Sequence, residues 1–389
     1  MPTRRDFLNA GLKTGAVCAA ASLVPGCTEH HRLAAKTAPP TPPITGPGSL
    51  KAHAKAAGLY MGAAVSLHPL RTDPDYSRTI AEQCDMVVAE TAMKWQTLRP
   101  APDRYFFDDA DELVAFADKH NMKVRGHNFV WHEAIPKWFE STVTKDNARQ
   151  FLVDHIHTVA GRYRGKIHSW DVVNEAIDPK SGAPDGLRKS IWFELLGPDY
   201  LAIAFRAARE ADPNALLTYN DYGIEYDNEE EGKKRDFILQ LLRRLKSGNV
   251  PIDAVGIQSH IKAGSTSTIG KGLADYMASI RDMGLQLFLT ELDVNEDDLP
   301  FDDLKQRDHA IAGVYRQFLD LTLRNASVEA VLTWGITDRY TWLNNIPTHK
   351  RKQPNRPQRS LPFDDDYRPT AAFFAMRESF DQRRGSKES

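Results

Sequence analysis

The sequence predicts an α/β fold, a (β/α)8 TIM barrel with enlarged βα loops. Eight short apolar runs alternate with helical patterns over about 335 residues, which is the order expected of a parallel sheet. Polar and aromatic residues follow these runs directly, and a closed barrel gathers the ends of its strands into one mouth. A doubly wound open sheet is the alternative, but no glycine-rich phosphate-binding turn follows the first run.

The N-terminus predicts an export signal over residues 1–36. Arg4 and Arg5 precede an apolar run of small residues from Gly11 to Val24, a pattern typical of twin-arginine signals. A short amphipathic helix is the alternative, although Lys13 is the only charge within the run. We therefore expect an exported protein that is periplasmic, attached to the cell surface or secreted.

A cysteine and a proline-rich segment follow the signal. Residues 23–27, Leu-Val-Pro-Gly-Cys, resemble the lipobox of bacterial lipoproteins, but Pro25 is unusual there, so a lipid anchor through Cys27 stays open. Residues 37–49 contain five prolines, which predicts a stiff, extended linker. The folded domain is expected over residues 50–381, and residues 382–389 are expected to form a disordered tail.

The apolar pattern places the individual elements. The predicted strands cover residues 59–64, 85–89, 123–127, 167–173, 215–219, 254–257, 286–290 and 329–333. Apolar residues recur at helical spacing over 110–120, 147–163, 200–210, 231–246, 272–283 and 308–324. His155 and His157 fall inside the second helix, where residues two apart face different directions, so we expect a structural role for them.

Composition and charge exclude several classes of protein. The net charge is −2, and residues 1–36 hold five basic and two acidic groups, so the remainder carries −2 − 3 = −5, which argues against a nucleic-acid partner. Beyond the N-terminus no 18-residue apolar stretch could span a membrane. Cys84 is the only cysteine after residue 30, which excludes a disulfide framework. We expect a monomer that needs no metal or other cofactor.

Two glutamates stand at the ends of the fourth and seventh predicted strands. Strands spaced ~4.8 Å apart and tilted ~36° give a barrel radius of roughly 7–8 Å. The carboxyl groups of Glu175 and Glu291 would then lie roughly 6 Å apart, between the ~5–5.5 Å of retaining glycosidases and the ~6.5–9.5 Å of inverting ones. The spacing permits a retaining mechanism without proving it.

The residues around these glutamates fit a sugar-binding cleft, because sugar rings stack on aromatic faces and sugar hydroxyls need converging hydrogen bonds. The candidate aromatic faces are Trp95, Trp131, Trp334, Trp342 and Tyr222. The candidate donors and acceptors are Glu90, Lys94, His127, Asn174 and Gln258. A single tryptophan is more often a core residue, so it is their grouping at strand ends that indicates sugar binding.

Several motifs in order resemble glycoside hydrolase family 10, the endo-β-1,4-xylanases. Residues 170–176 (WDVVNEA) and 289–294 (LTELDV) resemble the two active-site signatures of that family. Further matching motifs occupy residues 126–132, 219–222, 258–260, 333–338 with Trp342, and 361–364. The resemblance covers roughly residues 50–380. It implies a retaining endo-1,4-β-xylanase that cleaves internal linkages of xylan or xylo-oligosaccharides through a covalent glycosyl-enzyme intermediate.

The resemblance also implies roles for matching residues. Glu175 would act as general acid and then as general base, and Glu291 would be the nucleophile. His260 would orient Glu291, with Asp293 supporting it. The other implied roles are Asn174 for the 2-hydroxyl, Glu90, Lys94 and His127 for the glycone sugars, Trp334 and Trp342 as their cover, and Tyr222 for stacking on the leaving-group side. Thr91 stands where the family usually has asparagine, which puts glycone affinity in doubt.

A basic loop follows the eighth predicted strand. Residues 348–359 carry five certain positive charges in a domain that is otherwise net negative. The first interpretation is a solvated loop. The alternative is that its cations contact the carboxylate of a glucuronosyl branch on the substrate.

Three other functions stay open at this point. A β-1,4-glucanase could use the same pair of carboxylates. A non-catalytic carbohydrate-binding barrel would keep the tryptophans but lose a carboxylate, and both are present. A metal-dependent deacetylase or amidohydrolase would need histidines and carboxylates that converge on one metal ion.

Overall fold

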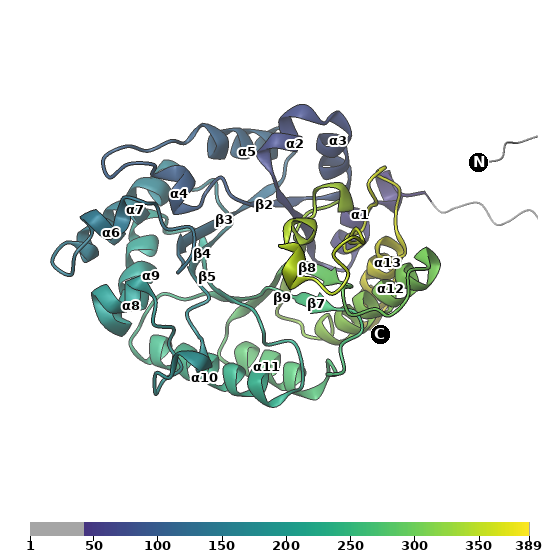
Figure 1. Cartoon of the computed structure of the whole chain (residues 1–389). Helices are drawn as coiled ribbons and strands as arrows, with labels where there is room; N and C mark the ends of the chain where they lie inside the picture. The colour runs from purple at the N-terminus through teal and green to yellow at the C-terminus, as the bar shows by residue number, and fades with distance from the viewer. Residues whose placement is uncertain (1–42, 389) are drawn as a thin grey trace, which may run out of the picture. The chain divides into compact units, whose positions relative to one another are not determined.

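The computed structural model describes residues 43–388, and its centre is a closed barrel of eight parallel strands (Figure 1). The strands are β1 (Tyr60–Val65), β2 (Met86–Ala89), β3 (Lys123–Val130), β4 (Ser169–Asn174), β5 (Leu216–Asp221), β6 (Ala254–Ile257), β8 (Gln286–Asn295) and β9 (Val328–Thr333). Pairing runs in chain order, with β6 next to β8 and β9 closing on β1. The predicted fold class and all eight predicted strands are confirmed.

Two strands run further than the sequence pattern predicts. Strand β3 continues to Val130, so His127 lies inside it. Strand β8 continues to Asn295, so Glu291 lies within the strand and not at its end. The extension of β8 pairs with an additional short strand, β7 (His260–Lys262), through the register His260 to Asp293. This pairing brings His260 beside the two carboxylates of β8.

Helices surround the barrel (Figure 1). The six predicted helices are confirmed as α5 (Asp108–Lys119), α7 (Ala148–Arg162), α9 (Tyr200–Ala211), α10 (Glu229–Ser247), α11 (Lys271–Asp282) and α12 (Leu304–Thr322). Those not predicted are α1 (Leu50–Ala56), α2 (Leu67–Thr72), α3 (Pro74–Gln83), α4 (Trp95–Leu98), α6 (Phe139–Thr142), α8 (Ile191–Leu196) and α13 (Ala371–Glu388). Most of the latter are too short for a helical period to show in sequence.

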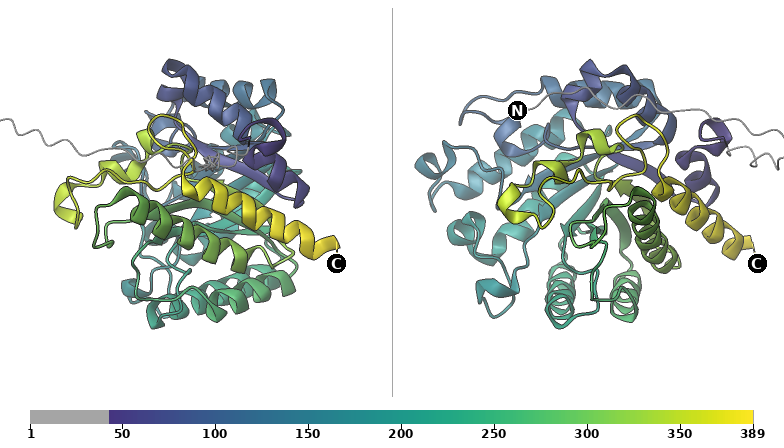
Figure 2. Two further views of the ribbon diagram at one scale, coloured as in Figure 1. Left: turned by 90° about the vertical axis from the view of Figure 1, so that its right-hand side faces the viewer. Right: turned by 45° about the vertical axis from the view of Figure 1, so that its right-hand side comes forward.

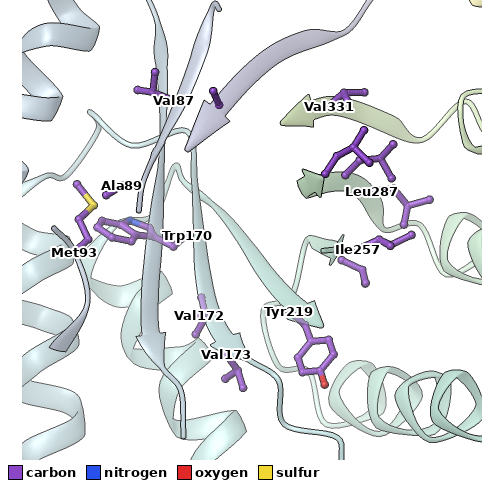
Figure 3. Packing of buried hydrophobic residues seen from close by; sticks show 14 of the residues in the cluster. Val87, Ala89, Met93, Trp170, Val172, Val173, Tyr219, Ile257, Leu287 and Val331 are labelled. Atoms are coloured by element: carbon purple, nitrogen blue, oxygen red, sulfur yellow. The ribbon is translucent and has the colours of Figure 1, made fainter. Parts of the chain in front are cut away.

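The alternation of side chains along each strand divides the core into two layers. Met86 and Val88 point into the barrel, where they cluster with Phe288. Val87 and Ala89 belong to the layer between strands and helices (Figure 3). Trp170 of β4 lies in this outer layer, and a Cβ at Gly126 would approach its ring to 1.9 Å. Glycine is therefore required where β3 crosses the indole.

The predicted linker is wrong in its last part, because residues 43–49 belong to the folded domain. Ser49 is fully buried and caps α1 by accepting from the Ala52 N–H. The Gln83 amide donates to the Ile44 carbonyl at 2.9 Å, and Arg377 donates to the Pro43 carbonyl. These contacts use backbone carbonyls, which composition cannot reveal. The predicted export signal, Cys27 and residues 37–42 lie outside the described residues.

The predicted disordered tail is also wrong, since α13 continues to Glu388 and lies along α12 (Figure 2). Arg383 is 5% exposed, and its guanidinium donates to the carbonyls of Leu323, Asn325 and Val328. Charged residues such as Arg383 suggest a solvated tail, but the Arg383 guanidinium instead donates hydrogen bonds to backbone carbonyls that follow the end of α12. None of the helices within residues 43–388 is long and apolar enough to cross a membrane.

Candidate active site

A cleft of about 440 Å³ opens at the carboxyl ends of the barrel strands. It is lined by every site residue predicted from the sequence except Asp293 and Trp95, together with His132 and Glu133. Asp293 lies beneath the lining, where it contacts His260 and Trp342. The barrel therefore brings together side chains that are more than two hundred positions apart in the chain.

Glu291 is buried and held on both of its oxygens. The Asn220 amide donates to Oε1 at 2.7 Å, and His260 Nε2 lies 3.2 Å from Oε2. Burial opposes ionisation, but the hydrogen bond from His260, the charge of His127 and the Asn220 amide outweigh it and lower the pKa of Glu291. The carboxylate therefore stays ionised, as a nucleophile must.

His260 lies between two carboxylates and contacts both. Its Nδ1 lies 2.9 Å from Asp293 Oδ1, and its Nε2 faces Glu291. Burial opposes protonation, but Asp293 and Glu291 together raise the pKa of His260 well above its ordinary value. The Trp342 indole donates to the other oxygen of Asp293 at 2.7 Å. Trp342 is therefore linked to Glu291 through Asp293 and His260.

Glu175 follows β4 directly and has the left-handed backbone angle φ 60°. Such a conformation costs free energy in a non-glycine residue, and the Glu175 N–H stabilises it by donating to the Asn220 carbonyl at 2.8 Å. Burial raises the pKa of the Glu175 carboxyl, although the Gln258 amide, which donates to Oε1 at 3.0 Å, lowers it in part. Glu175 is thus biased towards the protonated form that a general acid needs.

His132 lies beside the outer oxygen of Glu175, with its Nδ1 3.7 Å from Oε2. Burial and the nearby charge of Arg188 lower the pKa of His132 to about 4. The imidazole is therefore neutral at ordinary pH and does not hold Glu175 ionised through its charge.

Asn220 links the two glutamates, and the sequence assigned it no role. Its amide donates to Asn174 Oδ1 at 2.8 Å as well as to Glu291. Its side-chain oxygen Oδ1 accepts from the Thr290 hydroxyl at 2.8 Å. A Cβ at Gly256 would lie 2.1 Å from this oxygen, so glycine makes room for the side-chain amide. The only signal was its place in the motif at the end of a strand, where an asparagine could equally serve a turn.

His127 is oriented by a buried ion pair that the sequence also missed. Its Nδ1 lies 2.9 Å from one oxygen of Asp171, and Arg125 pairs with the other at 2.5 Å. The guanidinium lies over the Phe288 ring inside the barrel. Arg125 and Asp171 sit within apolar runs, where a charged residue gives no indication of its partner.

The aromatic lining offers faces on several sides of the cleft. Lys94 Nζ lies 4.8 Å from the Trp131 ring centre and 5.8 Å from that of Trp334. Burial lowers the pKa of Lys94, and the neighbouring glutamates only partly oppose this. Trp342 remains 37% exposed and Tyr222 39% exposed, which leaves both rings available for stacking.

Trp95 is not part of this lining, so its prediction as a sugar-stacking face is wrong. It begins helix α4 and is 3% exposed. Its ring stacks on His155 of α7 at 3.6 Å between centres, and its indole donates to the Phe129 carbonyl. The short helix turns the side chain inward, and His155 has the structural role that its mid-helix position predicted.

The basic loop does not supply carboxylate-binding cations to the cleft, so that hypothesis is not supported. Four of its five cations pair with aspartates, namely Arg351 with Asp297, Lys352 with Asp298, Arg356 with Asp302 and Arg359 with Asp308. None of the described side chains of the loop, residues 349–359, lines the cleft. These ion pairs hold the basic loop against the segment that follows β8.

Comparison with known proteins places the chain in a family. The model of glycosyl hydrolase family 10 matches residues 49–379. Endo-1,4-beta-xylanase B from Paenibacillus barcinonensis is 36% identical over 341 residues, which cover 82% of this chain and 95% of that protein. An exoglucanase from Acetivibrio thermocellus is 36% identical over 336 residues, 82% of this chain and 28% of that protein. The crystal structure of xylanase 10B from Thermotoga maritima superposes with a TM-score of 0.77 at 32% identity, covering 87% of this chain and 99% of the other. The chain belongs to glycosyl hydrolase family 10.

Proposed function

We propose that the protein is a retaining endo-1,4-β-xylanase that hydrolyses internal linkages of xylan and xylo-oligosaccharides. The observation that carries the proposal is the opposite bias of the two carboxyl groups in one cleft. Glu291 has a lowered pKa and Glu175 a raised one, so the cleft holds an ionised carboxylate beside a proton donor. Membership of glycosyl hydrolase family 10 supports the choice of Glu291 as a nucleophile. The named xylanases among its relatives support the choice of substrate.

The reaction proceeds in two displacements. In the first, Glu291 attacks the anomeric carbon and the glycosidic bond breaks. The electron pair of that bond stays on the leaving oxygen, which takes the proton from Glu175. In the second, ionised Glu175 removes a proton from water, and the water oxygen attacks the anomeric carbon and displaces Glu291. We assign the contact with the sugar 2-hydroxyl to Asn174, and its hydrogen bond to Glu175 at 3.0 Å supports this assignment.

The rival substrate is a β-1,4-glucan, because one relative is named an exoglucanase. Release of reducing ends from xylan, cellulose and mixed-linkage glucan under one set of conditions decides between them. We expect xylan to be cleaved fastest. Faster cleavage of either glucan would contradict the proposed substrate. For the deacetylase alternative, residues 43–388 contain no group of three His, Cys, Asp or Glu side chains placed to hold a metal ion.

The pH profile tests the role of His260. The enzyme must have Glu291 ionised, so activity on the acid side is lost as pH falls through the pKa of Glu291. His260 lowers that pKa, so His260→Asn raises it and moves the acid limb of kcat/KM to higher pH. The alkaline limb reports loss of the Glu175 proton and should not move. An unchanged acid limb would show that His260 does not control the ionisation of Glu291.

Export in folded form is a separate proposal, motivated by Arg4 and Arg5 before a weakly charged apolar run. Replacement of both by lysine should leave the enzyme in the cytoplasm, as measured by xylanase activity in cell fractions. Unchanged activity in the envelope and medium would exclude the twin-arginine route. Labelling with radioactive palmitate, with and without Cys27→Ala, tests the lipid anchor.

A further inference from the structure

Arg188 lies in the loop after β4 and contacts both Glu175 and Tyr222. Its Nε donates to the backbone carbonyl of Glu175 at 2.9 Å, and its Nη2 donates to the Tyr222 hydroxyl at 3.3 Å. Its Nη1 lies 3.4 Å from Asp178. The side chain is only 14% exposed, and neither the sequence motifs nor the cleft lining includes it.

Tyr222, whose hydroxyl Arg188 contacts, is also supported on one face of its ring. Lys234 Nζ lies 4.0 Å from the centre of the Tyr222 ring and pairs with buried Asp221 at 2.8 Å. Asp221 in turn accepts from the Tyr222 backbone N–H at 2.9 Å. Tyr222 is therefore fixed at its backbone, at one ring face and at its hydroxyl, while the rest of the ring stays open to the cleft.

We propose that Arg188 is a positioning residue for the leaving-group side of the cleft. It joins the backbone of the proton donor to the platform on which the departing sugar stacks, so that acid and platform keep a fixed relative position. Proton transfer needs the donor within about 2.6–3.2 Å of the leaving oxygen, and a misplacement of about 1 Å can cost 10²-fold in rate. This inference rests on the proposed glycosidase function and on Tyr222 as the leaving-group platform.

Two substrates with different leaving groups separate this role from a general structural one. Cleavage of xylotetraose releases a sugar fragment whose departure needs both the platform and the proton, whereas β-xylobiosyl fluoride loses fluoride, which needs neither. For Arg188→Met we expect kcat/KM on xylotetraose to fall about tenfold, the loss that corresponds to a charge-assisted hydrogen bond. On the fluoride we expect kcat/KM within about twofold of the parent, because this ratio reports the first displacement only.

A double-variant cycle tests whether Arg188 acts through Tyr222. Tyr222→Phe removes the hydroxyl and leaves the ring. On xylotetraose we expect Arg188→Met/Tyr222→Phe to be no slower than Arg188→Met alone, because the contact is already lost. Losses that multiply in the double variant would overturn the proposed path through the tyrosine hydroxyl.

The control is Arg316→Met, which makes the same chemical change at a surface arginine paired with Glu378. It should match the parent on both substrates. Equal losses on xylotetraose and on the fluoride in Arg188→Met would overturn the positioning role, even with an unchanged unfolding temperature. A parent enzyme that cleaves neither substrate would instead contradict the proposed function itself.

Discussion

Glu291→Ala is expected to lower kcat on xylo-oligosaccharides by several orders of magnitude, because the carboxylate proposed to attack the anomeric carbon is removed. The change also leaves the Asn220 amide and the His260 imidazole without the acceptor that they share. Azide fits the space of the lost carboxylate and can attack an activated aryl xylobioside from the same side. The product should be the α-glycosyl azide, with inverted configuration.

The anomer of that azide is measured by NMR, and a surface glutamate provides the control. Glu210→Ala removes an exposed carboxylate of α9 that pairs with His157. It should keep the parent rate and give no azide adduct. Substantial residual kcat in Glu291→Ala without azide would show that Glu291 is not the nucleophile.

Glu175→Ala is expected to slow poor leaving groups by about 10²–10⁴-fold, the contribution of a positioned acid. Aryl glycosides with good leaving groups should lose less in the first displacement, because they depart without a proton. Azide should restore turnover by attacking the glycosyl-enzyme intermediate, and the product should be the β-glycosyl azide. If both glutamate variants give the same anomer, the assignment of acid and nucleophile is wrong.

The sequence was sufficient for the barrel and for most of the cleft, for a physical reason. Buried parallel strands need short continuous apolar runs, and the run Ala254–Ile257 coincides with β6. The carboxyl ends of such strands meet at one mouth, so polar residues that follow them are close in space whatever their separation in the chain. This is why Glu175, Gln258 and Trp334 could be placed in one site before the structure was known.

Contacts between elements could not be predicted in this way. The bridge through Asn220 and the Arg125–Asp171 pair depends on which side chain of one strand faces which of its neighbour. Trp95 was misplaced because a single turn of helix decides whether it faces core or cleft. Arg383 was misplaced because backbone carbonyls, which have no sequence signal, bind its guanidinium.

The configuration of the first product tests the central claim most directly. Hydrolysis of xylohexaose by the parent enzyme is followed by ¹H NMR within the first minutes, before the anomers equilibrate. The proposed attack of ionised Glu291 on the anomeric carbon, with Glu175 as the acid, predicts the β-anomer as the first new reducing end, released from internal linkages. Initial appearance of the α-anomer would mean that water attacks directly, and it would contradict the covalent role of Glu291.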